Sequence, residues 1–305
     1  MTRLRFPALL AAMALAWTST ASAAPSASGV PDKPPVAFSV IKTGKSSAKE
    51  ALVWSGGSWG RNVDNNFSAI LIRHGDRELL FDTGLGAKVD SQYAQGMPGW
   101  AHAFFKYDKP IDPVRAQLQR AGVAPVRQII LSHSHWDHAS GVVDFPEAEV
   151  WVSPEELAVI KKPGAGLGQA WTSQVGDPRI AWRSLTFTPV AYHGFDRSLD
   201  LFGDGSVVLV PQYGHTPGSV GLFLTTSSGR RYFFCGDAVW SAAAIKDARR
   251  KSWLANQLAD GDKARTQAEI VRMSALAKRE PDLTIVPAHD ATVQNRLGYF
   301  PKWVE

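Results

Sequence analysis

The sequence predicts an α/β fold built as a layered sandwich, and two observations carry this prediction. Segments rich in strand-forming residues alternate along the chain with segments that have helical periodicity. One pattern also occurs twice, at residues 67–84 and 220–238: two apolar runs flank a turn that contains glycine, and an aspartate follows. The repeat indicates two similar halves, each with its own sheet.

The first element in chain order is a predicted export signal. Arg3 and Arg5 precede an apolar run of about a dozen residues. The small residues Ala21 and Ala23 then provide a cleavage site. This order is typical of a secretory signal peptide over residues 1–23, with an N-terminal membrane anchor as the alternative. A periplasmic or secreted protein is therefore expected.

The segment after the signal is predicted to be a disordered leader over residues 24–36, because it is rich in Pro, Ser and Ala. A single domain over residues 37–305 is expected to follow. No later stretch has the apolar length that a membrane-spanning helix needs, so we expect no stable membrane insertion.

Composition is that of a globular protein, with 45% hydrophobic and 20% charged residues. The net charge of +5 falls to +3 when Arg3 and Arg5 are removed with the signal (5 − 2), and this small surplus argues against nucleic-acid binding. The single cysteine, Cys235, excludes an intrachain disulfide. Because it lies in an apolar run, it is expected to be a buried, inert thiol.

Three helices are predicted between the strands. The first has Asp112 as its cap, and the second has Ser153 and Glu156 at capping-box spacing. The third has an apolar face that includes Met273, which is expected in the core. They span residues 112–122, 153–160 and 262–280.

An aromatic segment at residues 93–110 contains too many Gly and Pro residues to predict a regular element. Its aromatic side chains have three possible roles: covering the core, forming a pocket wall, or making a subunit contact in a homodimer. They are Tyr93, Trp100, Phe104, Phe105 and Tyr107.

The stretch "LSHSHWDHASG" concentrates ligand-type side chains directly after a predicted buried strand, although the chain has only 8 histidines. His133, His135 and Asp137 alternate, so an extended backbone projects them to one side, and His138 breaks that alternation as the chain turns. Neutral imidazoles and carboxylates suit zinc and similar divalent ions. This loop is therefore predicted to bind metal.

Three more ligand-type residues, His215, Asp237 and His289, each follow an apolar strand-like run. Loops at strand ends are where α/β proteins usually place a site for a small-molecule substrate. Five histidines and two aspartates match the ligand number of two adjacent ions that share one carboxylate.

The H-x-H-x-D-H run, "GHTPGS", "GDA" and "PAHD", in this order, resemble the metallo-β-lactamase superfamily of dinuclear hydrolases over roughly residues 50–305. The resemblance implies a four-layer αβ/βα sandwich with two mixed sheets, and two Zn²⁺ or other divalent ions between them. It assigns His133, His135 and His215 to the first ion, Asp137, His138 and His289 to the second, Asp237 as the bridge, and Asp82 as a support of the metal loop.

The resemblance also implies a reaction: a hydroxide shared by the two ions attacks a carbonyl or phosphorus centre, and Asp137 can relay a proton. An aspartate at position 237 is typical of the lactonase, glyoxalase and phosphotriesterase types and disfavours an antibiotic-cleaving β-lactamase. The chain looks most like the N-acyl-homoserine lactonase group and its secreted organophosphate-hydrolase relatives.

One departure concerns the substrate. Trp240 stands where those lactonases have a tyrosine, and an indole donates one hydrogen bond but cannot transfer a proton as a phenol does. The leading expectation is a zinc-dependent hydrolase of esters or lactones. Phosphotriesters are the alternative substrates, and a non-catalytic, metal-stabilised binding protein is the alternative class. The candidate substrate contacts are Trp240, Tyr213, Trp100, Phe104 and Phe105.

Overall fold

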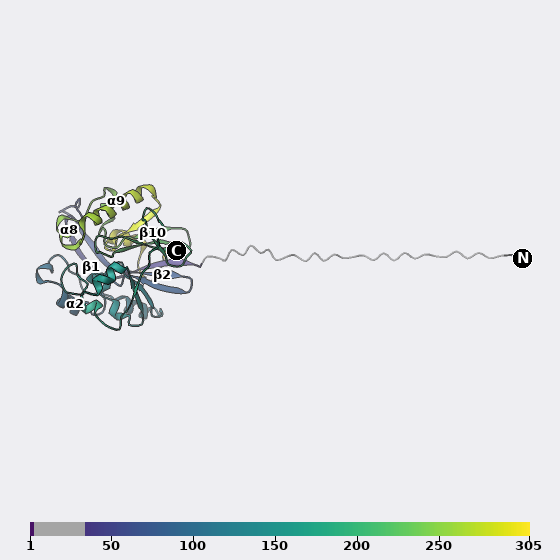
Figure 1. Ribbon diagram of the computed structural model, residues 1–305, viewed down its shortest axis with the longest axis horizontal. Coiled ribbons are helices and arrows are strands. Elements are labelled where there is room, and N and C mark those ends of the chain that lie inside the picture. The colour runs from purple at the N-terminus through teal and green to yellow at the C-terminus, as the bar shows by residue number, and fades with distance from the viewer. Residues whose placement is uncertain (3–33) are drawn as a thin grey trace. The chain divides into compact units, whose positions relative to one another are not determined.

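Two β-sheets organise the fold (Figure 1). The computed structural model describes residues 1–2 and 34–305, so the predicted signal peptide and most of the predicted leader lie outside the described residues. The first sheet has the strand order β1-β2-β3-β4-β5-β6, with bounds Val36–Lys49, Asn62–His74, Arg77–Phe81, Gln128–Ile130, Glu149–Val152 and Ala181–Ser184. The second has the order β11-β10-β9-β8-β7, with bounds Leu283–Val286, Arg231–Phe234, Val220–Thr225, Val207–Pro211 and Leu199–Asp200.

Helices connect and flank these strands. The α-helices α1 to α10 span Glu50–Val53, Val89–Gly96, Val114–Arg120, Trp136–Ala139, Pro154–Ile160, Thr172–Val175, Ala242–Lys246, Trp253–Ala259, Lys263–Arg279 and Ala291–Leu297. Two short 3₁₀ turns lie at Gly99–Ala101 and Val142–Asp144. Over the described residues, none of the helices combines the length and apolar character required to cross a bilayer.

The main core lies between the two sheets. Alternate residues of β2 point to opposite faces: Ile70 and Ile72 pack against the second sheet, whereas Ala69 and Leu71 pack against the layer that contains α3. Both faces of the first sheet are therefore buried, which explains why its central strands read as continuous apolar runs.

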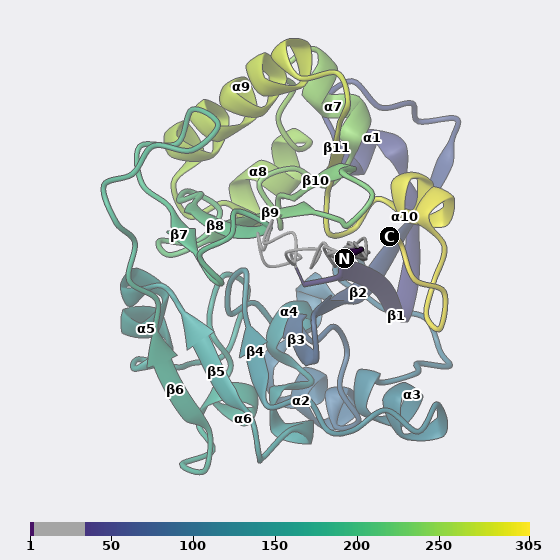
Figure 2. The ribbon, with the colours of Figure 1, turned by 90° about the vertical axis from the view of Figure 1, so that its right-hand side faces the viewer.

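A third cluster buries the outer face of the second sheet. Ile270, Met273 and Leu276 of α9 pack there with Cys235, and Figure 2 shows α7 and α9 on this side and α2, α3 and α6 beyond the first sheet. The order helix, sheet, sheet, helix confirms the predicted four-layer sandwich. Met273 and Cys235 are both in the core, as expected.

Both predicted hairpins form. β2 and β3 pair antiparallel around Gly75, whose φ of +62° is easily adopted by a residue without a Cβ, and β9 and β10 pair antiparallel in the second sheet. Two parallel pairs, β3 with β4 and β10 with β11, bring the carboxyl ends of these four strands to a common edge of the sandwich. The loops that leave this edge carry the predicted metal ligands.

Three local predictions were wrong. α3 begins at Val114 without a side-chain cap: Pro113 occupies the cap position, and Asp112, one residue earlier, forms an ion pair with Arg120. The start of the aromatic segment is helical, since α2 extends to Gly96 and tolerates the glycine at its end. β1 begins at Val36, so the last residue of the predicted leader belongs to the sheet.

Candidate metal centre

The histidine-rich loop leaves β4 and turns at once into α4. His133 and His135 lie on the extended part, and Asp137 and His138 lie in the first helical turn. The sequence predicted a loop throughout this stretch. The helical turn directs Asp137 and His138 to a different part of the site from the two histidines before them, and all four side chains are buried.

Folding brings all seven predicted ligands together. Their nitrogen and oxygen atoms form three overlapping groups, and within each group these atoms lie within 4.8 Å of one another. The groups are His133–His135–His215, His133–His138–Asp237 and Asp137–His138–His289. The first and third match the two ligand sets that the resemblance implies.

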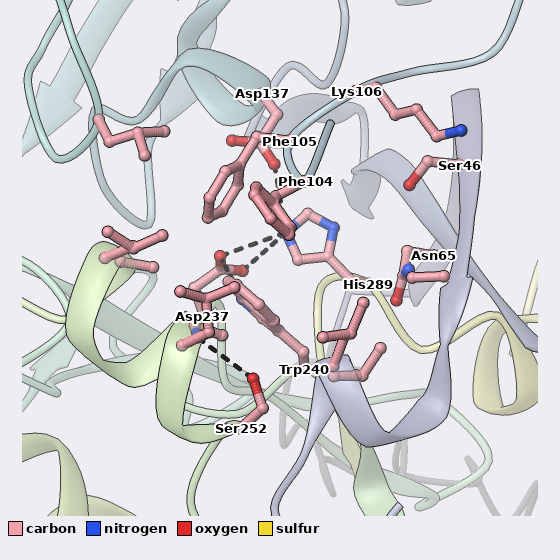
Figure 3. A pocket seen from close by; sticks show the side chains of 18 of the residues that line it. Ser46, Asn65, Phe104, Phe105, Lys106, Asp137, Asp237, Trp240, Ser252 and His289 are labelled. Atoms are coloured by element: carbon pink, nitrogen blue, oxygen red, sulfur yellow. Dashed lines mark hydrogen bonds and ion pairs between the residues drawn. The ribbon is translucent and has the colours of Figure 1, made fainter. Parts of the chain in front are cut away.

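Asp237 lies between the two sets. Its Oδ2 is 3.5 Å from Nε2 of His215, and its Oδ1 is 3.3 Å from Nε2 of His138. Oδ1 is also 3.1 Å from Nε2 of His289, which in turn lies 3.3 Å from Oδ2 of Asp137. One carboxylate that reaches histidines of both sets has the position of a bridging ligand, and Figure 3 shows it beside His289.

The chemistry of these atoms fits divalent cations. Nε2 of His133, His138 and His215 and Oδ1 of Asp237 are buried and make no hydrogen bond. A buried polar atom without a partner is rare and costs about 1–3 kcal/mol, so four in one place need an explanation. Inward-facing lone pairs on imidazole and carboxylate are what Zn²⁺ and similar ions bind.

Burial and charge set the protonation states that ligands need. Burial, with the neighbouring imidazoles, holds the pKa of His133 and of His135 well below the usual value. Both imidazoles are therefore neutral and can donate a lone pair to a metal ion. Burial opposes ionisation of Asp237, yet His289 and His138 outweigh it and hold the pKa of Asp237 well below its usual value. The carboxylate of Asp237 is therefore ionised and ready to bind a cation. Burial lowers the pKa of His138 and of His289, but the neighbouring carboxylates outweigh it and raise both above the usual value, so these two imidazoles lose a proton when a cation binds.

The opposite sides of the ligand rings are also held. Nδ1 of His138 lies 2.8 Å from Oδ2 of Asp82, and Oγ of Ser132 lies 2.8 Å from the same oxygen and 2.9 Å from Nδ1 of His133. Asp82 has a φ of 62°, a region that Asp tolerates better than most residues. A proton on Nδ1 leaves the Nε2 lone pair free to face the ion.

His215 and His289 are oriented by groups that were not among the predicted site residues. Nδ1 of His215 lies 2.9 Å from Oδ1 of Asp260, which also accepts a hydrogen bond from the buried Nζ of Lys251 at 2.6 Å. Burial opposes ionisation of Asp260, but Lys251 and then His215 hold its pKa well below the usual value. Nδ1 of His289 donates to the carbonyl of Asn66 at 2.7 Å.

The centre opens into a cavity of about 470 Å³. Phe104 and Phe105 form part of its wall together with Trp240, and apolar residues of α8 form another part, as the close view in Figure 3 shows. Lys106, next to Phe105, and Ser46, near the end of β1, are among the polar residues that line it. The cavity therefore combines a metal-binding floor with mainly apolar walls.

Two of the predicted substrate contacts lie elsewhere. Trp100 is 59% exposed and does not line the cavity. Tyr213 donates its hydroxyl to Glu155 at 2.8 Å and does not line the cavity either. Trp240 does line it, and its only donor, Nε1, makes a 2.8 Å hydrogen bond to Oδ2 of Asp237.

A layered αβ/βα sandwich with seven converging histidine and aspartate ligands defines a metallo-hydrolase type of protein. The family model described as "Metallo-beta-lactamase superfamily" matches residues 66–289, and the chain belongs to this superfamily.

Two similar proteins match most of this chain in sequence, and a solved structure matches it in fold. A probable metallo-hydrolase of Mycobacterium tuberculosis is 29% identical over 241 residues, which cover 72% of this chain and 73% of the relative. N-acyl homoserine lactonase AttM of Azorhizobium caulinodans is 22% identical over 70% of this chain and 81% of its own. A solved N-acyl homoserine lactone hydrolase with N-hexanoyl-L-homoserine at its catalytic metal centre has a TM-score of 0.66, 19% identity, and coverage of 89% and 100%.

Proposed function

We propose that this protein hydrolyses an ester or lactone with an apolar acyl arm, using two divalent cations, Zn²⁺ in the first instance. The main support is the geometry around Asp237: its carboxylate lies between two ligand sets at the floor of a cavity with mainly apolar walls. Relatives described as N-acyl homoserine lactonases, one solved with an acyl-homoserine product, support an acyl lactone as the substrate type.

Different residues of the site have different roles in this proposal. When bound, two such cations lower the pKa of a water molecule and polarise the bond under attack. Phe104 and Phe105 hold the acyl arm and exclude water from the cavity. Asp137 lines the same cavity, and its Oδ2 lies 3.3 Å from Nε2 of His289. This position places its carboxylate where it can accept the proton that the reaction releases.

A phosphotriester is the second candidate substrate, and one contact favours it. Because the indole N–H of Trp240 is bonded to Asp237, this side chain positions a ligand and offers no acid to a leaving group. A substrate whose leaving group departs as a stable anion, such as an aryl ester or aryl phosphotriester, needs no such acid.

The decisive experiment is a substrate panel on protein reconstituted with Zn²⁺, Mn²⁺ or Co²⁺. It compares acyl-homoserine lactones of increasing chain length, aryl esters and an aryl phosphotriester, each with and without chelator. Chelator-sensitive turnover of lactones or esters supports the proposal, and preferential turnover of the phosphotriester supports the second candidate. No turnover at two ions per chain would reject both and support the non-catalytic binding protein, although all seven ligands are present.

We also propose that the chain is exported, on the evidence of its N-terminal sequence. N-terminal sequencing of the protein from cell fractions tests this: cleavage after Ala23 and recovery outside the cytoplasm support export, and an intact N-terminus in the membrane fraction supports the anchor. Light scattering on the same material tests the expected homodimer.

A further inference from the structure

Glu156, in the first turn of α5, contacts both loops that carry the three-histidine ligand set. Its side chain is fully buried. Oε1 accepts hydrogen bonds from the backbone N–H of Ser134 at 2.7 Å and from its hydroxyl at 2.5 Å. Oε2 accepts from the hydroxyl of Thr216 at 2.6 Å and from the backbone N–H of Gly218 at 3.2 Å. Each carboxylate oxygen therefore holds a different loop.

The positions of these partners connect Glu156 to the ligands. Ser134 separates His133 from His135, and Thr216 directly follows His215. The first loop leaves β4 of the first sheet, and the second joins β8 to β9 of the second sheet. Glu156 thus fixes, across the space between the sheets, the two backbones whose histidines must converge on one ion.

The loop around Gly218 is packed directly beneath α5. A Cβ built at Gly218 would lie 2.1 Å from the backbone nitrogen of Glu156 and 2.3 Å from Oγ of Ser153, and this hydroxyl donates to the carbonyl of Gly218 at 2.7 Å. The backbone contact and the carboxylate contacts hold the same loop, so the loop around Gly218 has little freedom to move.

The site requires a carboxylate rather than an amide. All four groups around Glu156 donate, and the amide nitrogen of a glutamine would place a fifth donor among them. Among residues 34–305 the charge of Glu156 has no cationic side chain as a partner. Histidine binds a metal as a neutral ligand, so Asp237 is the only one of the predicted ligands of this set that brings a negative charge to the ion, and a second buried carboxylate behind the histidines favours ion binding as well as order.

We propose that Glu156 is a positioning residue that sets the metal affinity of the His133–His135–His215 set, with little effect on the Asp137–His138–His289 set. This inference concerns ion binding and needs no knowledge of the substrate.

The test compares Glu156→Gln with Glu155→Gln, the neighbouring acid, which is half-buried, accepts a 2.8 Å hydrogen bond from the hydroxyl of Tyr213 and is not bonded to Ser134 or Thr216. Metal-free protein is titrated with Zn²⁺ against a chromophoric chelator, and with Co²⁺ followed by its absorption spectrum. We expect E156Q to bind one of its two ions about tenfold to a hundredfold more weakly and the other as the wild type does, and E155Q to bind both normally.

Thermal unfolding with and without Zn²⁺ distinguishes positioning from a structural role. A ligand that binds the native state raises the melting temperature according to its affinity, so E156Q should gain less from Zn²⁺ than E155Q does. An equal rise in melting temperature on adding Zn²⁺ in both variants, with the affinities for both ions unchanged, would overturn the proposal. This holds even if E156Q melts at a lower temperature without metal.

Two further variants keep the test decisive if E156Q does not fold. Ser134→Ala and Thr216→Val each remove one hydroxyl from the carboxylate and leave its charge in place. Each should weaken the same single ion several-fold. Wild-type affinity for both ions in both variants would overturn the proposal.

Discussion

The proposed two-ion site is tested most directly at Asp237, because this residue contacts histidines of both ligand sets. Replacing it with alanine removes the carboxylate that the two sets share, leaves His289 without its closest anion and leaves Nε2 of His138 without the carboxylate that faces it at 3.3 Å. We expect Asp237→Ala to retain about one ion per chain and to lose activity by at least about a hundredfold. Metal analysis and steady-state kinetics measure both effects.

The control for this variant is Asp247→Ala, which removes an exposed acid from a nearby stretch of chain and should keep two ions and full activity. A ratio of two tightly bound ions in Asp237→Ala would contradict the bridging assignment.

At the scale of single residues, the metal ligands could be predicted from the sequence. The residues that hydrogen-bond to the ligand side chains and orient them could not. His215 and His289 are recognisable because each histidine follows an apolar strand within a Gly- or Pro-containing loop. Asp260 stands two residues before the cap of α9 and resembles any loop aspartate, and Ser132 is one of many serines. Their roles arise only from contacts with residues distant in sequence, for which one sequence gives no signal.

At the scale of elements, α9 carries a pH-sensitive group. Burial raises the pKa of Glu269 from 4.5 to about 7; Arg272 opposes this rise and Asp196 adds to it. A carboxyl group that holds its proton more tightly in the folded than in the unfolded chain favours folding below pH 4.5. That contribution is lost as the pH rises toward 7, because ionisation costs more in the folded chain.

Glu269→Gln removes this dependence. We expect the variant to match the wild type near pH 4.5 and to exceed it above pH 7, by at most about 3 kcal/mol in the free energy of unfolding. Urea unfolding of metal-free protein at both pH values measures the difference. The exposed acid Asp282 is the control, since Asp282→Asn should show no such divergence. The same difference in the free energy of unfolding between the wild type and Glu269→Gln at both pH values would contradict the prediction.

The segment at residues 103–106 provides a second test at this scale, because it forms a cavity wall and carries no metal ligand. Phe105 lies there with its ring centroid 6.4 Å from that of Trp240. Phe105→Ala should raise KM about tenfold for a long-chain acyl substrate, since it removes apolar contact area, and should leave an acetyl substrate nearly unchanged.

Trp100→Ala is the matched control, because it removes an exposed aromatic side chain close in sequence but outside the cavity. Equal changes in KM for long and short substrates in Phe105→Ala would show that Phe105 does not hold the acyl arm.

Secondary structure could be predicted where local chemistry decided it. Ser153 caps α5, as its spacing from Glu156 in the sequence predicted. Asp112 was predicted as a cap in the same way, but α3 begins one residue later, with Pro113 at the cap position, and the Asp112 carboxylate pairs with Arg120. The turn α4 could not be predicted, because four residues are too few for periodicity and its ligands suggested a loop.

At the scale of the whole molecule, the proposed ions would link the two sheets. His133 to His138 follow a strand of the first sheet, whereas Asp237 and His289 follow strands of the second. Removing the ions with a chelator should therefore lower the melting temperature by on the order of 10 °C, and adding Zn²⁺ back should restore it. An unchanged melting temperature in fully metal-free protein would contradict this link.

A layered α/β sandwich with two similar halves was predictable at this scale, because the repeated hairpins and the alternation of strands and helices are properties of the sequence itself. The order of the four layers was implied only by the family resemblance. The face of the first sheet that packs against the second sheet could not be predicted from the pattern. Both faces are apolar, so local patterning cannot distinguish the side that contacts the other sheet from the side that contacts the helices. The resemblance to a known family supplied that information.

The cavity walls and the ion ligands come largely from separate stretches of chain: residues 103–106 and α8 contribute only to the walls. Grafting or randomising those stretches should thus yield enzymes of altered selectivity that still load their ions. The scaffold is a practical starting point for engineering, with the reactive floor left untouched.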